Sequence, residues 1–408
     1  MRLCAHVSCE DHPLKARLFA ALLCSLPSAM AAQGTADSSK FEVYGFAMMD
    51  AGYNANQIDP AWFDVVRPTK LPAFENQFAP DGNAYFSARQ SRLGVRSTVP
   101  TSVGTLKTTF EFELFGTGVD AGQTTFRLRH AYGELGKWGA GQTWSPFMDI
   151  DVFPNSVEYW GPTGMVFFRN VQVRYMPIQG DTRMTIALER PGASADQGDV
   201  AGRIEIADVR PRFPVPDLSA EYRRAMKWGY IEISGIARYI KWEDQGTDAF
   251  DLSGDAVGWG IHGSTNVKIG EQNVVRGSVV YGEGIQNYMN DAPADVGIET
   301  NAGDPVAPVQ GVPLPMIGVV AFLDHTWNEK FSSSVGYSMI DIDNSELQSP
   351  DAFSRGDYAL GNLLYSPAPG VTTGAELQWG HRDNFSDGFD SEQFRVQFSF
   401  KYAFSKTF

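Results

Sequence analysis

The last strand-length segment of the chain alternates apolar and polar side chains, and this pattern limits what the protein can fold into. Every second residue from Phe394 to Phe404 is aromatic or aliphatic, and polar residues such as Arg395 and Lys401 stand between them. Successive side chains of a strand point to opposite faces, so one face of this segment is apolar and the other is polar. We expect no later segment to cover the apolar face, and lipid on one side with a wet lumen on the other satisfies both. The segment therefore predicts the closing strand of a transmembrane β-barrel.

The N-terminus has the residue order of a secretory leader. Lys15 and Arg17 precede a short apolar run at 18–23, and the small residues of 27–31 end in an A-x-A cleavage site after Ala31. The alternative, a buried N-terminal helix, fits this order less well. We predict a signal peptide at 1–31, a short N-terminal segment at 32–39 and a single barrel domain at 40–408.

Composition agrees with a barrel and excludes other classes of protein. The three cysteines all lie inside the leader, so we expect neither disulfides nor a thiolate nucleophile in the mature chain. After the leader, no run approaches the ~18 consecutive apolar residues that a membrane helix needs. The net charge of −15 argues against nucleic acid as a partner.

Strand-length segments cover most of the chain and predict an all-β, antiparallel barrel of about 16 strands. They are 41–53, 84–98, 104–115, 123–135, 137–143, 169–177, 181–190, 216–225, 228–240, 254–267, 273–283, 316–328, 331–342, 355–366, 370–383 and 391–404. Short turns alternate with longer connections, which include 54–83, 144–168, 191–215 and 284–315. Outer-membrane barrels have short periplasmic turns and long extracellular loops, so this alternation predicts the orientation of the chain. A barrel of this size is wide enough for an aqueous channel.

Several stretches together resemble the DcaP-type porins, a trimeric outer-membrane channel family associated with the uptake of dicarboxylic acids. They are RQSRLGVR (89–96), RLRHAYGEL (127–135), GQTWS (141–145), YGEGI (281–285) through Asn290-Asp291, and NLLYSP (362–367). The resemblance implies a homotrimer in the outer membrane, surrounded by lipid and lipopolysaccharide, that passes small anionic solutes. Some members carry a predicted coiled coil before the barrel, and here only 32–39 separate the leader from the first strand.

Strand alternation places a group of basic side chains in the lumen. The inward positions are Arg92, Arg96, Lys107, Arg127, Arg129 and Arg174, whereas Arg89 has the opposite parity and reaches the lumen only if a bulge intervenes. The resemblance implies that segment 144–168 folds into the lumen, and it carries Asp149, Asp151 and Glu158 beside several aromatic residues. A ring of arginines forms forks for carboxylates and selects anions, so we predict that these ten residues line a constriction.

Other interpretations of the same residues stay open. The arginines could pair with Glu111, Glu113 or the acids of 144–168 and only brace the wall, as structural ion-pair networks do. The aromatic residues of 144–168 could instead form a sliding surface for sugars. The acidic external segments 284–315, 343–354 and 384–394 fit a solvated face better than a calcium site, because they lack regular ligand spacing.

The sequence gives little support to an enzymatic function. No H-E-x-x-H, P-loop, C-x-x-C or G-x-S-x-G motif occurs. A barrel lipid hydrolase would need a serine and a histidine close together with an orienting third group. His325 and Thr326 are the nearest candidates, but a histidine beside a tryptophan is typical of the interfacial girdle. We therefore predict a channel without catalytic activity, cofactor or metal.

Overall fold

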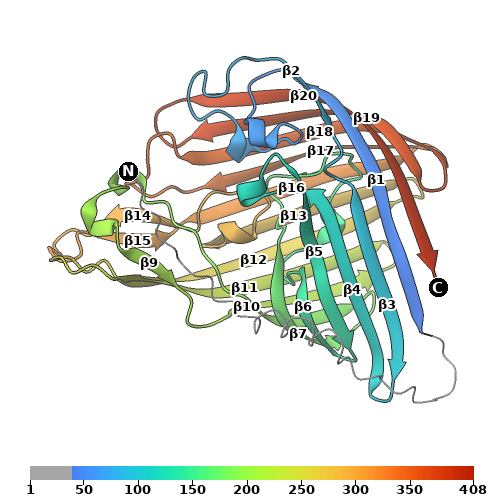
Figure 1. Cartoon of the computed structure of the whole chain (residues 1–408), viewed down its shortest axis with the longest axis horizontal. Helices are drawn as coiled ribbons and strands as arrows, with labels where there is room; N and C mark the ends of the chain where they lie inside the picture. The colour runs from blue at the N-terminus through green and yellow to red at the C-terminus, as the bar shows by residue number, and fades with distance from the viewer. Residues whose placement is uncertain (1–38) are drawn as a thin grey trace, which may run out of the picture. The chain divides into compact units, whose positions relative to one another are not determined.

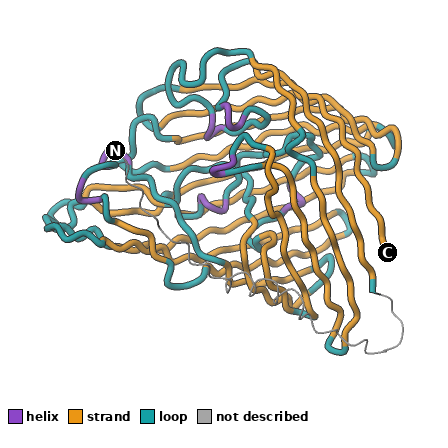
Figure 2. The backbone as a smooth tube through the Cα atoms, viewed as in Figure 1, coloured by secondary structure: helices purple, strands orange, loops and turns teal. Residues whose placement is uncertain are grey.

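The computed structural model describes residues 39–408, which form an antiparallel β-barrel (Figures 1 and 2). The predicted leader 1–31 and nearly all of segment 32–39 lie outside the described residues. The wall strands, in order, are β1 (Lys40–Asn54), β2 (Asn83–Ser87) with β3 (Arg92–Thr101), β4 (Gly104–Phe115), β5 (Thr124–Leu135), β6 (Trp138–Trp144), β7 (Arg169–Ile178), β8 (Arg183–Glu189), β10 (Asp217–Met226), β11 (Gly229–Asp244), β12 (Gly254–Ile269), β13 (Asn273–Glu283), β16 (Pro315–Thr326), β17 (Phe331–Ile342), β18 (Phe353–Ala368), β19 (Val371–Asn384) and β20 (Asp390–Thr407).

The sheet closes where the first strand meets the last. β1 pairs with β20 from Glu42 opposite Thr407 to Asn54 opposite Arg395. The sheet contains 18 strands, but β9 (Val209–Arg212) pairs only with the end of β11, beyond the part that pairs with β10, and β2 and β3 share one position beside β1, which leaves 16 wall strands. Closure pairs the backbone groups that an open edge would expose to lipid. The predicted fold class is confirmed.

The closing strand has the two faces that its sequence predicts. Phe398 and Phe400 are about half exposed on the outer face, whereas Arg395 and Gln397 are buried inside. The same alternation recurs on β16, where Leu323 is exposed and Phe322 is buried. The outer wall is therefore apolar and suited to lipid.

Connection lengths differ between the two ends of the barrel. Short turns at 102–103, 136–137, 179–182, 227–228, 270–272, 327–330 and 369–370 lie at the end where β1 begins and β20 ends. The longer connections at the other end are 55–82, 116–123, 145–168, 190–216, 245–253, 284–314, 343–352 and 385–389. This is the arrangement of periplasmic turns and extracellular loops in outer-membrane barrels.

The long connections contain short regular elements of their own. β14 (Val296–Thr300) pairs with β15 (Val309–Pro313) in a separate hairpin. The 3-10 helices are η1 (Pro60–Trp62), η2 (Pro68–Lys70), η3 (Gly118–Asp120), η4 (Ile150–Val152), η5 (Gly198–Val200), η6 (Ile204–Ile206) and η7 (Gln286–Tyr288). Within the described residues, no helix has the length and apolar character to cross a membrane.

One side of the barrel interior is filled by an apolar core. Segment 145–168 contributes Phe147 and Met165, and β16 and β17 contribute Val320 and Ile340 from the wall. The segment also touches the wall backbone at Gly164, whose N–H donates to Ser338 Oγ at 2.9 Å. Apolar packing thus holds the segment against β16 and β17.

We predict that a side chain at Gly164 moves this segment. A Cβ atom there would lie 1.9 Å from the carbonyl oxygen of Met339, so Gly164→Ala must push the segment off the wall and toward the lumen. Single-channel conductance in planar bilayers should fall. The matched change Gly263→Ala meets no atom within 4 Å and should conduct like the wild type. Equal conductance of both variants would contradict the packing described here.

Candidate functional site

Four arginines from three wall strands surround the carboxylate of Glu113 on β4. Glu113 is 1 % exposed, and its oxygens lie within 4 Å of all four guanidinium groups. The shortest N–O distances are 2.6 Å to Arg129, 3.3 Å to Arg92, 3.6 Å to Arg169 and 3.7 Å to Arg127. A second carboxylate, that of Glu111, lies 2.6 Å from Arg129 and 3.6 Å from Arg92.

Strand pairing and one bulge assemble this group. Glu113 stands directly opposite Arg92 on β3 and Arg127 on β5. The register between β4 and β5 then shifts, because His130 pairs with Glu111 while Leu128 pairs with Phe112. The shift leaves Arg129 as the extra residue of a bulge, and bulges redirect side chains in this way. Arg129 consequently points inward beside His130 and reaches both glutamates.

The group carries a net positive charge. Four guanidinium groups face two carboxylates, so the local formal charge is +4 − 2 = +2. Arg129 is the tightly held member, with 6 % of its side chain exposed, whereas 31 % of the Arg127 side chain is exposed. Arg127 is therefore the member of the group most available to a solute.

Segment 145–168 meets this group through Tyr159. The Tyr159 hydroxyl donates to Glu113, and its ring stacks on Phe115 with centroids 3.8 Å apart and an angle of 6°. Arg127 Nη1 lies 3.5 Å from the same hydroxyl. Burial raises the pKa of Tyr159, so the phenol stays protonated and remains a donor.

Two cavities of about 300 Å³ each border Tyr159 and Phe167. The outer cavity, toward the long connections, is lined among others by Arg67, Arg127, Arg169, Gln286, Asn287 and Trp160. The inner cavity, toward the short turns, is lined among others by Gln90, Arg92, Arg129, Phe153, Glu158 and Lys401. Both cavities thus combine cationic groups of the wall with aromatic rings of segment 145–168.

Arg89 lies inside the barrel but is not open to the lumen. Three residues of β1, 47–49, face the four residues 88–91 between β2 and β3, so the strand expected at 84–98 is interrupted there by one extra residue. Arg89 is 1 % exposed and pairs with Asp64 at 2.6 Å. Its Nη2 donates to the Gly116 carbonyl at 2.9 Å. These contacts make Arg89 a structural side chain.

Three other predicted residues lie outside the arginine group. Arg96 pairs with Glu42 at 3.9 Å and is 54 % exposed, and Lys107 is exposed near the short-turn end of β4. Arg174 donates to the Trp144 carbonyl at 2.6 Å. The prediction that Arg174 lies with Arg92, Arg127 and Arg129 is therefore wrong.

The acidic residues of segment 145–168 do not pair with the predicted arginines. Asp149 and Asp151 each lie 2.5 Å from Arg223 on β10, and Asp149 also accepts a bond from Tyr230 at 2.6 Å. Glu158 accepts hydrogen bonds from the N–H groups of Val66, at 3.1 Å, and Gly161. Burial raises the pKa of Glu158 to about 8. These acids anchor the segment inside the barrel.

Sequence reasoning missed Arg169, Arg223 and the link made by Tyr159. Alternation along β7 assigns Arg169 to the outer face, because Asn170 and Gln172 are buried inside. At Arg169 the chain passes from segment 145–168, which lies in the lumen, into the barrel wall. The first side chain of β7 therefore turns inward. Arg223 has inward parity on β10, but the pattern alone did not pair it with Asp149.

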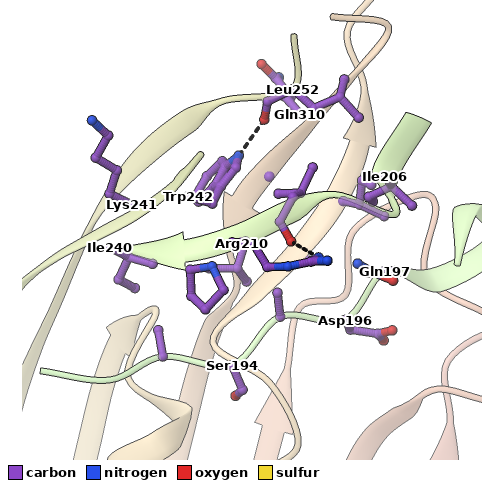
Figure 3. Close-up of a pocket in the computed structure, with 18 of the residues that line it drawn as sticks. Ser194, Asp196, Gln197, Ile206, Arg210, Ile240, Lys241, Trp242, Leu252 and Gln310 are labelled. Atoms are coloured by element: carbon purple, nitrogen blue, oxygen red, sulfur yellow. Dashed lines mark hydrogen bonds between the residues drawn. The ribbon is translucent and has the colours of Figure 1, made fainter. Parts of the chain in front are cut away.

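A third cavity lies among the long connections, away from the arginine group (Figure 3). It has a volume of about 230 Å³ and is bordered by Ile240, Trp242 and Leu252. The Trp242 indole donates to the Leu252 carbonyl at 2.8 Å (Figure 3). Arg210 borders the cavity, but its Nη1 donates hydrogen bonds to backbone carbonyls, among them that of Ala207 at 2.7 Å. This cavity therefore offers mainly apolar contacts.

One group on the outer face has the spacing of metal ligands. Ligand atoms of Asp357, His381 and Asp383 lie within 4.8 Å of one another. Asp357 is already paired with Arg355 at 2.9 Å, and it faces His381 at 3.5 Å. Ion pairing within the protein accounts for this group.

A closed antiparallel barrel with an apolar outer wall, a charged lumen and an inward-folded segment defines an outer-membrane porin. The chain belongs to the DcaP outer membrane protein family, whose model matches residues 25–289, more than half of the chain. The protein is therefore an outer-membrane channel protein. No curated protein matches the chain significantly.

Solved porin structures share the fold. The outer membrane channel DcaP of Acinetobacter baumannii has a TM-score of 0.75 and 21 % identity, covering 90 % of this chain and 98 % of that one. An anion-selective porin from Comamonas acidovorans has a TM-score of 0.58 and 12 % identity, covering 90 % and 100 %. The trimer form of OmpT from Vibrio cholerae has a TM-score of 0.54 and 13 % identity, with the same coverage.

We predict that Arg129 stabilises the barrel and that Arg127 does not. Arg129→Ala leaves two buried carboxylates without their closest partner, and breaking a buried pair costs about 3–5 kcal/mol. The variant should therefore lose its unheated, fast-migrating gel band at a lower temperature than the wild type. Arg127→Ala removes a half-exposed side chain 3.7 Å from Glu113 and serves as the control. Equal melting of the two variants would contradict the assignment.

Proposed function

We propose that this channel passes small anionic organic solutes, and dicarboxylates in particular, through the constriction between segment 145–168 and the arginine group. The observation that carries the proposal is the excess of guanidinium groups around Glu113. Arginine presents a planar fork that suits carboxylates, and a lumen with excess positive charge favours anions.

Transport would be passive diffusion biased by electrostatic focusing. At 4 Å and an effective dielectric near 20, one charge pair is worth about 4 kcal/mol before desolvation is subtracted. Glu111 and Glu113 offset part of this attraction, so each solute should be held weakly and released. The structures similar in fold include one described as an anion-selective porin, which supports the proposal by analogy.

A channel for neutral sugars is the second candidate. Both cavities are bordered by Tyr159 and Phe167, and Phe153 and Trp160 line one cavity each. Such rings can stack on sugar faces. The cationic groups on both sides of these rings favour anions over sugars.

The surroundings of His325 do not support a catalytic role. His325 lies on the outer face, where its Nδ1 is 2.8 Å from Asn273 Oδ1 and its ring packs edge-on against Trp327 at 4.3 Å. This is the setting of an interfacial girdle residue. We infer that the protein acts as a channel and not as a lipid hydrolase.

We further propose a homotrimer. The ladder between β5 and β6 runs only from Ala131 opposite Gln142 to Leu135 opposite Trp138. The part of β5 beyond it carries Phe126, which is 79 % exposed. Gln142 Nε2 donates across the gap to the carbonyls of Leu128, at 3.2 Å, and Arg129, at 3.3 Å, and a second copy would cover the rest of this edge, which lipid cannot satisfy. The trimeric form of OmpT is consistent with this arrangement.

Liposome swelling tests the solute preference. Replacing Arg127 and Arg169 together by Gln removes the two guanidiniums held most loosely by Glu113, at 3.7 and 3.6 Å. Entry of succinate should slow several-fold while entry of glucose stays near the wild-type rate. Arg96→Gln is the control, because Arg96 is an exposed arginine outside the group. Unchanged succinate entry in the double variant would mean that these arginines only brace the wall.

A further inference from the structure

Two aromatic side chains of segment 145–168 border both cavities beside the arginine group. They are Tyr159 and Phe167, and arginines of the group line each cavity, Arg127 and Arg169 the outer one and Arg92 and Arg129 the inner one. The Tyr159 hydroxyl donates to Glu113 and so ties the segment to the wall at this point. A solute that moves from the outer cavity to the inner one must pass this link.

Two guanidinium groups that border the outer cavity, those of Arg127 and Arg169, make no short ion pair among the described residues. Arg169 has 6 % of its side chain exposed, and its Nη1 is buried without a hydrogen-bond partner among the described residues. The closest carboxylate oxygens lie 3.6 Å from Arg169 and 3.7 Å from Arg127, which is longer than a hydrogen bond. A buried donor without a partner is unfavourable, so Arg169 can bind a carboxylate without breaking an existing hydrogen bond, and Arg127 would give up only its 3.5 Å contact with the Tyr159 hydroxyl.

The inner cavity offers a second set of cations. Arg92 and Lys401 line it, and Arg129 closes it at the wall. Arg92 lies 3.3 Å from Glu113, and 23 % of its side chain is exposed. A carboxylate that leaves Arg127 and Arg169 therefore meets a further cationic group on the other side of Tyr159.

We propose that Tyr159 is a partition between two carboxylate-binding cavities and that an anionic solute displaces it. A carboxylate held by Arg127 and Arg169 offers the Tyr159 hydroxyl a new acceptor in place of Glu113. Glu113 keeps Arg129 at 2.6 Å and Arg92 at 3.3 Å, so it is not left unpaired. The partition opens when an anion arrives and closes again when the hydroxyl returns to Glu113.

This inference rests on the proposed anion pathway and adds a residue that controls it. Hydrogen bonds to carboxylates are stronger than those to neutral groups. A cation or a neutral solute therefore cannot replace Glu113 as the acceptor for the Tyr159 hydroxyl as well as a carboxylate can. Tyr159 would thus favour solutes with a carboxylate over uncharged solutes of the same size.

Single-channel recording of Tyr159→Phe tests the partition. The variant keeps the ring that stacks on Phe115 and loses only the hydroxyl link. Conductance in KCl should rise, and the blocks caused by added succinate should shorten several-fold. Tyr337→Phe is the matched control, because its hydroxyl donates to Asp357 on the outer face, away from both cavities. It should behave like the wild type.

Arg169→Gln provides a second, independent arm. It keeps the Tyr159 link and removes one guanidinium group that borders the outer cavity, so succinate blocks should weaken while KCl conductance stays close to the wild-type value. Unchanged succinate blocks in either variant would overturn the partition.

The wild-type reversal potential distinguishes failure of the partition from failure of the proposed anion pathway. A channel that prefers anions but is insensitive to Tyr159→Phe refutes only the partition. A wild-type channel that prefers cations refutes the proposed function itself.

Discussion

The buried carboxylate of Glu113 is the point where the barrel wall and the inward-folded segment meet. It is 1 % exposed and accepts a hydrogen bond from Tyr159 while four arginines surround it. A buried charge without partners would be strongly unfavourable, so Glu113 requires cations at this position. Those cations outnumber the carboxylates, so the group around Glu113 has a positive formal charge although the whole chain carries a net charge of −15.

The barrel interior is divided into an apolar side and a charged side. On the apolar side, Phe147 and Met165 pack against inward residues of β16 and β17 such as Val320. Asp149, near the beginning of the segment, pairs with Arg223 on β10, and this ion pair fixes that part of the segment to the wall. Arginines of β3, β5 and β7 line the space that remains, together with residues of β1 and of β18 to β20 such as Lys401. In the proposed anion pathway, selectivity would therefore depend on how the segment is anchored as well as on the arginines themselves.

The fold could be predicted from the sequence because its main signal is local. Alternation at 393–404 and the alternation of short and long connections define an outer-membrane barrel without any tertiary information. Strand parity also placed Arg92, Arg127 and Arg129 inside, and the structure brings these three together around Glu113.

The remaining site contacts depend on tertiary structure and could not be derived from alternation. Arg169 points inward only because the chain emerges from the lumen just before β7. Arg89 is inside because of an extra residue between β2 and β3. It is not open to the lumen, because it pairs with Asp64 on the connection between β1 and β2. The most direct test of the central claim is the reversal potential of the purified wild-type protein in a KCl gradient. We expect chloride to be favoured over potassium, with the preference weakening as salt rises, because screening acts within about 10 Å at 0.1 M. A preference for potassium at low salt would contradict an anion-selective constriction.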